Sequence, residues 1–426
     1  MLRTLRPTLL FSVLAYGLAL TCPRGVYAQE WLSDRRYSEG IGVKLSEGLV
    51  LHPGVGAEVG YDTNVFYASE NRLDAARLRV TPHVDLGTLP PQRLGDEGEE
   101  RVNPKTEFRL SLAAIYQEYF GEDQVVTQRD VGVNAGIRLS LFPQGRWSFT
   151  LSDDFTRTNN PTADLGSITA PTDRDQNRAE AVLRYAPGGG NFEFNLGYAF
   201  YISYFEREEL QQAGNYTMHE VFERIRWRWL PKTALLHEAR VSPTFHAGDN
   251  RSSTPIRTRI GINGLLTNRL SLLLMAGYGV AFYSDGQDFD SFLAQAELRY
   301  IIGPMSNLRV GYERDFHQAL IANYYLRDRG YLAYAHMFGG RFLLTLEGSV
   351  SSLGFSPILP GAGCGGETGR RDVLLEAGLF GEYRIQDWIA VNASVRQQSD
   401  ITDYSCSDYP ADYSRQEVFA GVRAFY

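Results

Sequence analysis

The chain has 426 residues, of which 22% are charged, and a formal net charge of −8 at pH 7. Surfaces that bind nucleic acid usually carry a concentrated positive excess, so this balance argues against nucleic acid as the main partner. Beyond the first 28 residues no apolar run approaches the ~20 residues that a membrane-spanning helix needs, which excludes a helical membrane protein. The 42 glycines, 25 tyrosines and 23 phenylalanines belong to a folded chain rather than a disordered one.

The first 28 residues predict a secretory signal peptide. Arg3 and Arg6 form a basic start, the segment from Leu9 to Leu20 is apolar, and Ala28 ends a Val-Tyr-Ala sequence suited to cleavage. We therefore expect an exported protein with a short periplasmic segment over residues 29–49 and one folded region over residues 50–426.

From residue 50 onward, apolar residues alternate with polar or small ones, and a period of two is that of a β-strand. Over Asn191–Phe205, for example, Phe192 and Leu196 fall on one face, whereas Glu193 and Asn195 fall on the other. Eighteen strands are predicted, with 16 as the alternative. Their ranges are 50–61, 76–87, 106–118, 129–142, 147–158, 177–186, 191–204, 217–229, 234–245, 256–266, 269–283, 291–302, 307–316, 324–338, 341–352, 372–385, 388–398 and 415–426.

The connections between these strands alternate in length. Those after even-numbered strands are mostly tight turns, such as Pro231-Lys232, whereas those after odd-numbered strands are long and polar, such as Ser399–Ser414. This alternation, with aromatic residues near many strand ends, is typical of outer-membrane barrels with short periplasmic turns and long extracellular loops. The fold class is therefore all-β, a transmembrane antiparallel up-and-down β-barrel. A soluble sandwich would have shorter strands, and the long connection Gly87–Lys105 does not fit the pattern.

If the apolar face meets lipid, the other face lines an aqueous lumen. Its charges either form cross-strand ion pairs around ordinary water or contact a polyanion or polyhydroxylated chain, since guanidinium groups bind carboxylate and hydroxyl oxygens. Tyrosines on this face either stack on sugar rings or fill space. The predicted contacts are Arg77, Arg79, Arg109, Arg138, Arg224, Arg226, Arg228, Arg257, Arg259, Arg327, Arg329, Glu220, Glu238, Tyr201 and Tyr283.

Two cysteines follow the signal peptide, Cys364 and Cys406, each in a predicted external loop. In an oxidising compartment they form either one disulfide between the two loops or two free thiols. The histidines are scattered, so neither a metal site nor a cofactor is predicted. His237 is predicted to face outward, but no serine partner is evident and the chain is not expected to be an enzyme.

The last strand ends on an aromatic residue. Val418, Ala420, Val422, Ala424 and Tyr426 alternate up to the final position. This pattern resembles the C-terminal signal by which the barrel-assembly machinery recognises bacterial outer-membrane proteins, so that machinery is an expected partner together with outer-membrane lipid and lipopolysaccharide.

The motif Gly60-Tyr61-Asp62-Thr63-Asn64-Val65-Phe66 resembles the opening of the type 2 family of β-barrel porins, and Trp31 to Gly42 is similar to the entry segment of its myxobacterial members. The spacing of the predicted strands extends this resemblance over the whole barrel. The resemblance implies an outer-membrane porin of a Gram-negative bacterium, in many members the outlet for an exopolysaccharide or capsule polymer, working with a separate periplasmic polysaccharide export protein.

Export of a polysaccharide is therefore the first predicted function, with the polymer and the periplasmic export protein as partners. A porin for diffusion of small solutes is the alternative, and a constricting loop would favour it; the loop Asn159–Gln176 is long enough to constrict the lumen. A barrel whose loops serve surface adhesion or assembly is a third, weaker possibility.

Overall fold

The computed structural model of the chain describes residues 40–46, 48–88, 105–158, 173–188, 190–248, 251–358, 369–402, 404 and 412–426. The predicted signal peptide, both cysteines, and most of the connections 87–105 and 159–176 lie outside these ranges. Residues 36–426 form one compact unit. No helix in the described part of the chain is long and apolar enough to cross a membrane.

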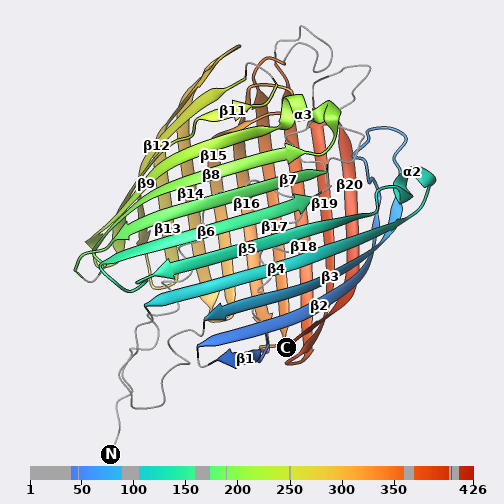
Figure 1. Ribbon diagram of the computed structural model, residues 1–426, viewed down its shortest axis with the longest axis horizontal. Coiled ribbons are helices and arrows are strands. Elements are labelled where there is room, and N and C mark those ends of the chain that lie inside the picture. The colour runs from blue at the N-terminus through green and yellow to red at the C-terminus, as the bar shows by residue number, and fades with distance from the viewer. Residues whose placement is uncertain are drawn as a thin grey trace, which may run out of the picture. The chain divides into compact units, whose positions relative to one another are not determined.

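One antiparallel sheet contains all the strands of the described residues, and two short helices of this part of the chain lie in its connections (Figure 1). The elements are β1 (Val43–Ser46), β2 (Leu49–Asp62), β3 (Ala75–Thr88), β4 (Thr106–Phe120), α2 (Asp123–Val126), β5 (Asp130–Leu141), β6 (Trp147–Thr158), β7 (Arg174–Tyr185), β8 (Phe192–Phe205), α3 (Glu208–Gly214), β9 (Tyr216–Leu230), β10 (Thr233–Val241), β11 (Thr244–His246), β12 (Ser253–Leu265), β13 (Leu270–Tyr283), β14 (Phe289–Gly303), β15 (Ser306–Gln318), β16 (Tyr324–Phe338), β17 (Phe342–Phe355), β18 (Arg371–Gln386), β19 (Ile389–Thr402) and β20 (Tyr413–Phe425).

The sheet closes into a barrel because β2 pairs with both β3 and β20, from Gly54 opposite Phe425 to Asp62 opposite Glu417. The short strand β1 is an addition that pairs with β2. Strands β10 and β11 share one barrel position between β9 and β12. The barrel therefore has 18 positions, which confirms the predicted architecture and strand count.

The predicted strand 234–245 is divided into β10 and β11 by Ser242 and Pro243. Proline has no backbone N–H to donate to the ladder. The carbonyl of Pro243 still accepts from the N–H of His219 at 2.9 Å, and the N–H of Ser242 donates to the carbonyl of Pro255 at 2.9 Å. The interruption is thus local, and both neighbouring strands continue past it.

The two ends of the barrel differ. At one end the strands are joined by short turns, such as residues 231–232 and 304–305, and we call it the turn end. At the other end, the loop end, lie α2 and α3 (Figure 1). Short turns face the periplasm in barrels of this type, so we assign the turn end to the periplasmic side.

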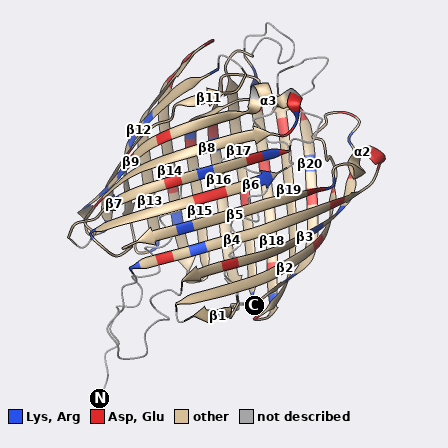
Figure 2. Cartoon of the chain, viewed as in Figure 1, with Lys and Arg blue, Asp and Glu red and all other residues tan. Residues whose placement is uncertain are grey.

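The two faces of the wall also differ, as the alternation predicts. Outward side chains are exposed and apolar, including Val59 at 63% and Ile260 at 65% of their area, whereas inward Glu58 and Asp62 are 4% and 0% exposed. Charged residues of both signs occur within the strands, separated by uncharged ones (Figure 2). At the turn end, Trp227 is among several exposed outward-facing aromatic side chains.

At the loop end, side chains from the connections pack with side chains from the lumen face of the strands. We call this group the mouth cluster, and it contains Tyr67, Ala319, Ala322, Tyr325, Leu353, Phe355, Ile358, Leu374, Tyr404 and Tyr413. Arg251 reaches the same region from another connection, because its Nη1 donates to the carbonyl of Leu320 at 2.9 Å. The connection between β15 and β16 therefore folds inward over the lumen.

Candidate functional site: the lumen wall

The register of the strands decides which side chains share the lumen, because residues directly opposite in an antiparallel pair lie on the same face. Arg79 lies opposite Glu58, and Tyr201 lies opposite Arg178. By this register all the predicted lumen residues fall on the inner face. Their role as contacts to a polymer or ion stays a prediction.

Near the loop end the charges form compact ion-pair networks. Asp62 is completely buried and accepts from Arg77 Nη1 at 2.9 Å and from Arg415 Nε at 3.0 Å. Glu417 accepts from the same two arginines at 2.6 and 2.9 Å. The hydroxyl of Tyr67 accepts a further bond from Arg415. This network joins β2, β3 and β20, where the first and last barrel strands meet.

Several other arginines of the loop half are paired in the same way. Asp315 accepts from both Arg257 and Arg259, and Arg79 lies 2.6 Å from Glu58. Further contacts of this kind join Arg178 with Glu220 at 2.9 Å, Arg327 with Glu313 at 3.7 Å, Arg396 with Glu376 at 3.2 Å, and Arg370 with Asp372 at 2.7 Å. In this half, ion pairs hold the wall, as one of the two interpretations of the sequence predicted.

The motif at Gly60–Phe66 belongs to this wall. The N–H of Asn64 donates to Asp62 Oδ1 at 3.1 Å, and Asn64 Nδ2 donates to the carbonyl of Ser414 at 3.1 Å. Asn64 Oδ1 in turn accepts from the N–H of Ala68 at 2.8 Å, which shapes the loop after β2. At Gly60 an added Cβ would overlap the ring of Phe419 on β20. The motif therefore fixes the seam of the barrel.

Toward the turn end a second set of arginines lines the lumen with fewer acidic partners. We call it the arginine ring: Arg109, Arg138, Arg226, Arg228, Arg299 and Arg309, each within five residues of the turn end of its strand. Two pairs of like charge lie directly opposite each other, Arg109 with Arg138 and Arg299 with Arg309. Opposed like charges on neighbouring strands destabilise a sheet unless another charge compensates them.

Carboxylates compensate this ring only in part. Arg109 Nε lies 2.9 Å from Asp85 Oδ2, and Arg299 lies 3.9 Å from a carboxylate oxygen of Glu297. The remaining four members make no ion pair within 4 Å among the described residues: Arg138, Arg226, Arg228 and Arg309. The turn half of the lumen thus carries guanidinium groups that form no close ion pair among the described residues.

The ring surrounds the lumen. Strands β4 and β5 are nine barrel positions from β14 and β15, half of the circumference, and β9 lies midway between the two pairs. An anion on the barrel axis would therefore meet guanidinium groups on at least three sides. This arrangement follows from register and closure, and the alternation of residues alone does not reveal it.

One inward residue departs from the alternation. On β15, Asp315 faces the lumen, so Phe316 should face outward. It lies inside instead, with its ring stacked on Phe289 at 4.0 Å between centroids and with Arg257 over it at 3.9 Å. The pairing of β15 with β14 ends at Arg314. Beyond this residue β15 is no longer held by β14, and the chain turns inward toward the connection between β15 and β16.

The exterior carries polar groups that the sequence interpretation missed. His237 faces outward as predicted, with Nδ1 2.7 Å from Glu223 Oε1 and Nε2 3.4 Å from Thr258 Oγ1. The hydroxyl of Thr258, the imidazole of His237 and the carboxylate of Glu223 contact one another in the same order as the three groups of a catalytic triad. Thr258 is paired in the sheet with both Ala239 and Tyr278, however, so the surrounding backbone amides are occupied by the ladder rather than aimed at an oxyanion.

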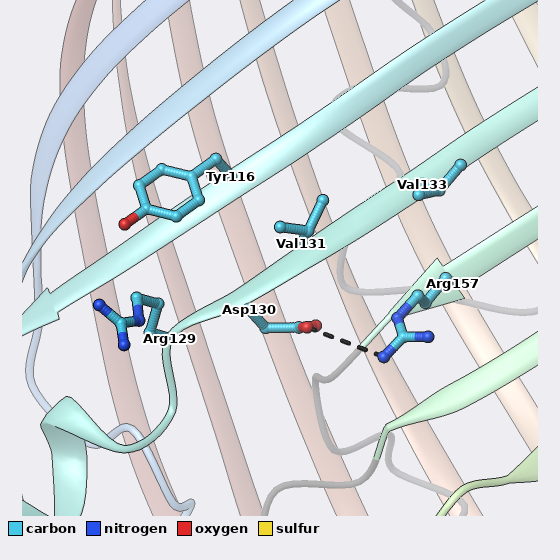
Figure 3. A pocket seen from close by; sticks show the side chains of 6 residues that line it. All are labelled: Tyr116, Arg129, Asp130, Val131, Val133 and Arg157. Carbon is cyan, nitrogen blue, oxygen red and sulfur yellow. Dashed lines mark ion pairs between the residues drawn. The ribbon is translucent and has the colours of Figure 1, made fainter.

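A hollow on the outer wall lies near the loop ends of β4, β5 and β6 (Figure 3). It is lined by Tyr116, Arg129, Asp130, Val131, Val133 and Arg157. Its charges are largely satisfied, because Arg157 pairs with Glu206 at 2.5 Å and lies 4.0 Å from Asp130. The hollow is separate from the lumen.

The closed barrel, its apolar exterior and its charged lumen define an outer-membrane β-barrel. No family model matches the sequence, and no curated protein matches it. The resemblance to type 2 porins and to myxobacterial export barrels therefore stays a prediction.

Among solved structures, the chain is similar to Pseudomonas aeruginosa OccK1 (OpdK), with a TM-score of 0.48, 9% identity, and coverage of 88% of this chain and 99% of that one. It is also similar to Pseudomonas aeruginosa OpdQ, with a TM-score of 0.46, 10% identity, and coverage of 88% of this chain and 99% of that one. The similarity to Acinetobacter baumannii OccAB4 has a TM-score of 0.46 and 9% identity, and it covers 88% of this chain and 98% of that one.

Proposed function

We propose that this barrel is an outer-membrane porin that admits small anionic solutes. The observation that carries the proposal is the arginine ring, in which two arginine pairs face each other across strands and four members make no ion pair within 4 Å among the described residues. Rings of arginine or lysine side chains are the usual basis of anion selectivity in pores. Of the functions predicted from the sequence, this is the small-solute alternative, narrowed to anions.

The electrostatics of the lumen support this direction of selectivity. A passing anion relieves the repulsion within Arg109–Arg138 and Arg299–Arg309, whereas a cation adds to it. A low-dielectric wall focuses the field of the ring into the water-filled channel. Anions are thus concentrated at the turn end, although the chain as a whole carries a net charge of −8.

The loop end supports a small solute more than a polymer. The connection between β15 and β16 lies in the mouth cluster, and Arg251 ties it to the connection that follows β11. A polysaccharide chain needs an uninterrupted passage, whereas a small solute can pass beside inward-folded loops. The predicted constricting loop, residues 159–176, lies mostly outside the described residues. Residues of the connection between β15 and β16, such as Ala319 and Ala322, belong to the mouth cluster.

Planar-bilayer recordings test the anion preference. Under a KCl gradient the wild-type protein is expected to give a reversal potential that reports chloride permeating faster than potassium. The double substitution Arg138→Gln and Arg309→Gln removes two uncompensated charges and should lower the permeability ratio several-fold. The matched control, Arg138→Lys and Arg309→Lys, keeps both charges and should retain most of the preference. A cation-selective wild-type channel, or an unchanged ratio in the glutamine variant, would refute the proposal.

A deletion strain separates the proposal from the export hypothesis. Loss of this chain should slow growth on small organic anions as sole carbon sources and leave extracellular polysaccharide unchanged. If extracellular polymer falls instead, and complementation restores it, the barrel is an export outlet and the proposal of small-anion uptake is wrong.

A further inference from the structure

Part of the lumen wall on β5 and β6 carries polar side chains that have no partner in the wall itself. Asn134 on β5 lies directly opposite Thr156 on β6, and Arg138 lies directly opposite Ser152. These four side chains are at least partly exposed, and within the described part of the chain they form no side-chain hydrogen bond and no ion pair within 4 Å. Their polar groups are therefore available to a solute in the water-filled lumen.

The charges on this stretch follow a fixed order along the strands. Arg138 lies nearer the turn end, with Arg109 directly opposite it on β4. Asp154 lies two residues beyond Ser152 on the same face of β6, directly opposite Gly136. An added Cβ at Gly136 would stand 3.0 Å from Asp154 Oδ1, so the carboxylate lies over a position without a side chain. A solute that extends along this wall meets two guanidinium groups first and a carboxylate beyond them.

This order favours a solute with one acidic group and a neutral remainder. The planar guanidinium fork binds carboxylate oxygens, so the acidic group suits Arg109 and Arg138. A second acidic group farther along would be repelled by the carboxylate of Asp154. An ionised carboxylate only accepts hydrogen bonds, whereas the hydroxyls of Ser and Thr and the amide of Asn both donate and accept. Hydroxyl groups on the solute satisfy both kinds of partner.

The same wall does not favour an aromatic acid. By register, the lumen faces of β5, β6 and β7 carry no aromatic side chain, whereas those of β8 and β9 carry Tyr201 and Phe222. The ring of an aromatic solute would find no ring to stack on beside Arg138. A hydroxylated, non-aromatic body therefore fits this wall better.

We propose that the preferred solutes are sugar acids, which are hydroxylated carboxylates. Their acidic group binds Arg109 and Arg138, and their hydroxyl groups bind along the stretch formed by Ser152, Asp154, Thr156 and Asn134. The pair Arg138–Ser152 and the pair Asn134–Thr156 lie four residues apart, ~13 Å along the strands at ~3.3 Å per residue, which leaves room for a six-carbon acid. The inference rests on the proposed function, because Arg109 and Arg138 belong to the arginine ring.

Two six-carbon acids of the same charge test the inference. Gluconate is hydroxylated along its chain, and hexanoate is not. Each is added to a planar bilayer in which the wild-type protein carries a chloride current, and the concentration that halves this current is measured. Gluconate should block at a concentration about fivefold or more below that of hexanoate, which is the effect of one net hydrogen bond.

A double substitution places the effect on this wall. Ser152→Ala with Thr156→Val removes two hydroxyl groups and changes no charge, so the two blocking concentrations should become nearly equal, with hexanoate as the internal reference. The matched control, Ser394→Ala with Thr345→Val, makes the same chemical changes on the lumen faces of β19 and β17. It should keep the wild-type ratio, and loss of the gluconate preference in this control would overturn the assignment to β5 and β6.

The outcomes separate this inference from the proposed function. Equal block by both acids in a wild-type channel that prefers chloride to potassium overturns the inference and leaves the anion selectivity in place. A wild-type ratio in the variant with Ser152→Ala and Thr156→Val does the same. A cation-selective wild-type channel overturns the proposed function, and the inference with it.

Discussion

Replacing Asp62 by asparagine should be among the most destabilising single changes in the barrel wall. Asp62 is fully buried and accepts bonds from Arg77, Arg415 and the N–H of Asn64. Asparagine fills the same space but carries no charge, so two buried guanidinium groups are left with Glu417 as their remaining carboxylate in this network. Removing one partner of a buried ion pair costs about 3–5 kcal/mol, and Asp62→Asn should lower the free energy of unfolding by about that amount.

Urea unfolding in detergent, followed by tryptophan fluorescence, measures this loss if wild type and variant give the same m-value. Asp123→Asn in the exposed helix α2 is the matched control, and it should change the free energy of unfolding by no more than about 0.5 kcal/mol. A loss below about 1 kcal/mol for Asp62→Asn would show that the network does not hold the seam, and that Glu417 alone compensates both arginines.

Two further predictions concern the same wall and the arginine ring. Gly60→Ala should cost about 1–3 kcal/mol in the same unfolding assay, because the added Cβ meets the ring of Phe419 and the carbonyl of Val418 on β20. The anion preference should stay constant from about pH 5 to pH 9, because arginine remains charged throughout that range; a preference that disappears with rising pH in reversal-potential recordings would assign the selectivity to a histidine instead.

The strands could be predicted from the sequence because a half-buried wall leaves a period of two in every segment. The segment predicted at 191–204 is β8, Phe192–Phe205, and the predicted strand 147–158 is β6, Trp147–Thr158. The wall departs from this pattern where its pairing is incomplete. Pro243 interrupts the predicted strand 234–245, and Phe316 turns inward where β15 leaves β14.

For the candidate site, the sequence could predict only which side chains face the lumen. Alternation assigns each arginine to the lumen, but its partner depends on register between strands that are distant in sequence. Arg415 meets Asp62 across 353 residues, a contact that follows from closure of β20 onto β2. The contact of His237 with Thr258 likewise needed the pairing of β10 with β12, and a search for a serine near His237 in the sequence could not find it.

The inward arginines differ between the two halves of the lumen in how many of them form ion pairs, and this difference suggests two roles for them. In the loop half, inward-folded connections must be held against a wide opening, and buried pairs such as Asp62 with Arg415 fix the strands that carry them. In the turn half, short turns already fix the strands, so Arg226 and Arg228 need no carboxylate to hold the wall and remain available to the water-filled channel. The same residue type is therefore structural where loops must be anchored and, in the proposed function, selective where turns suffice. A carboxylate in place of Ala234, which lies opposite Arg228, would convert the second role into the first.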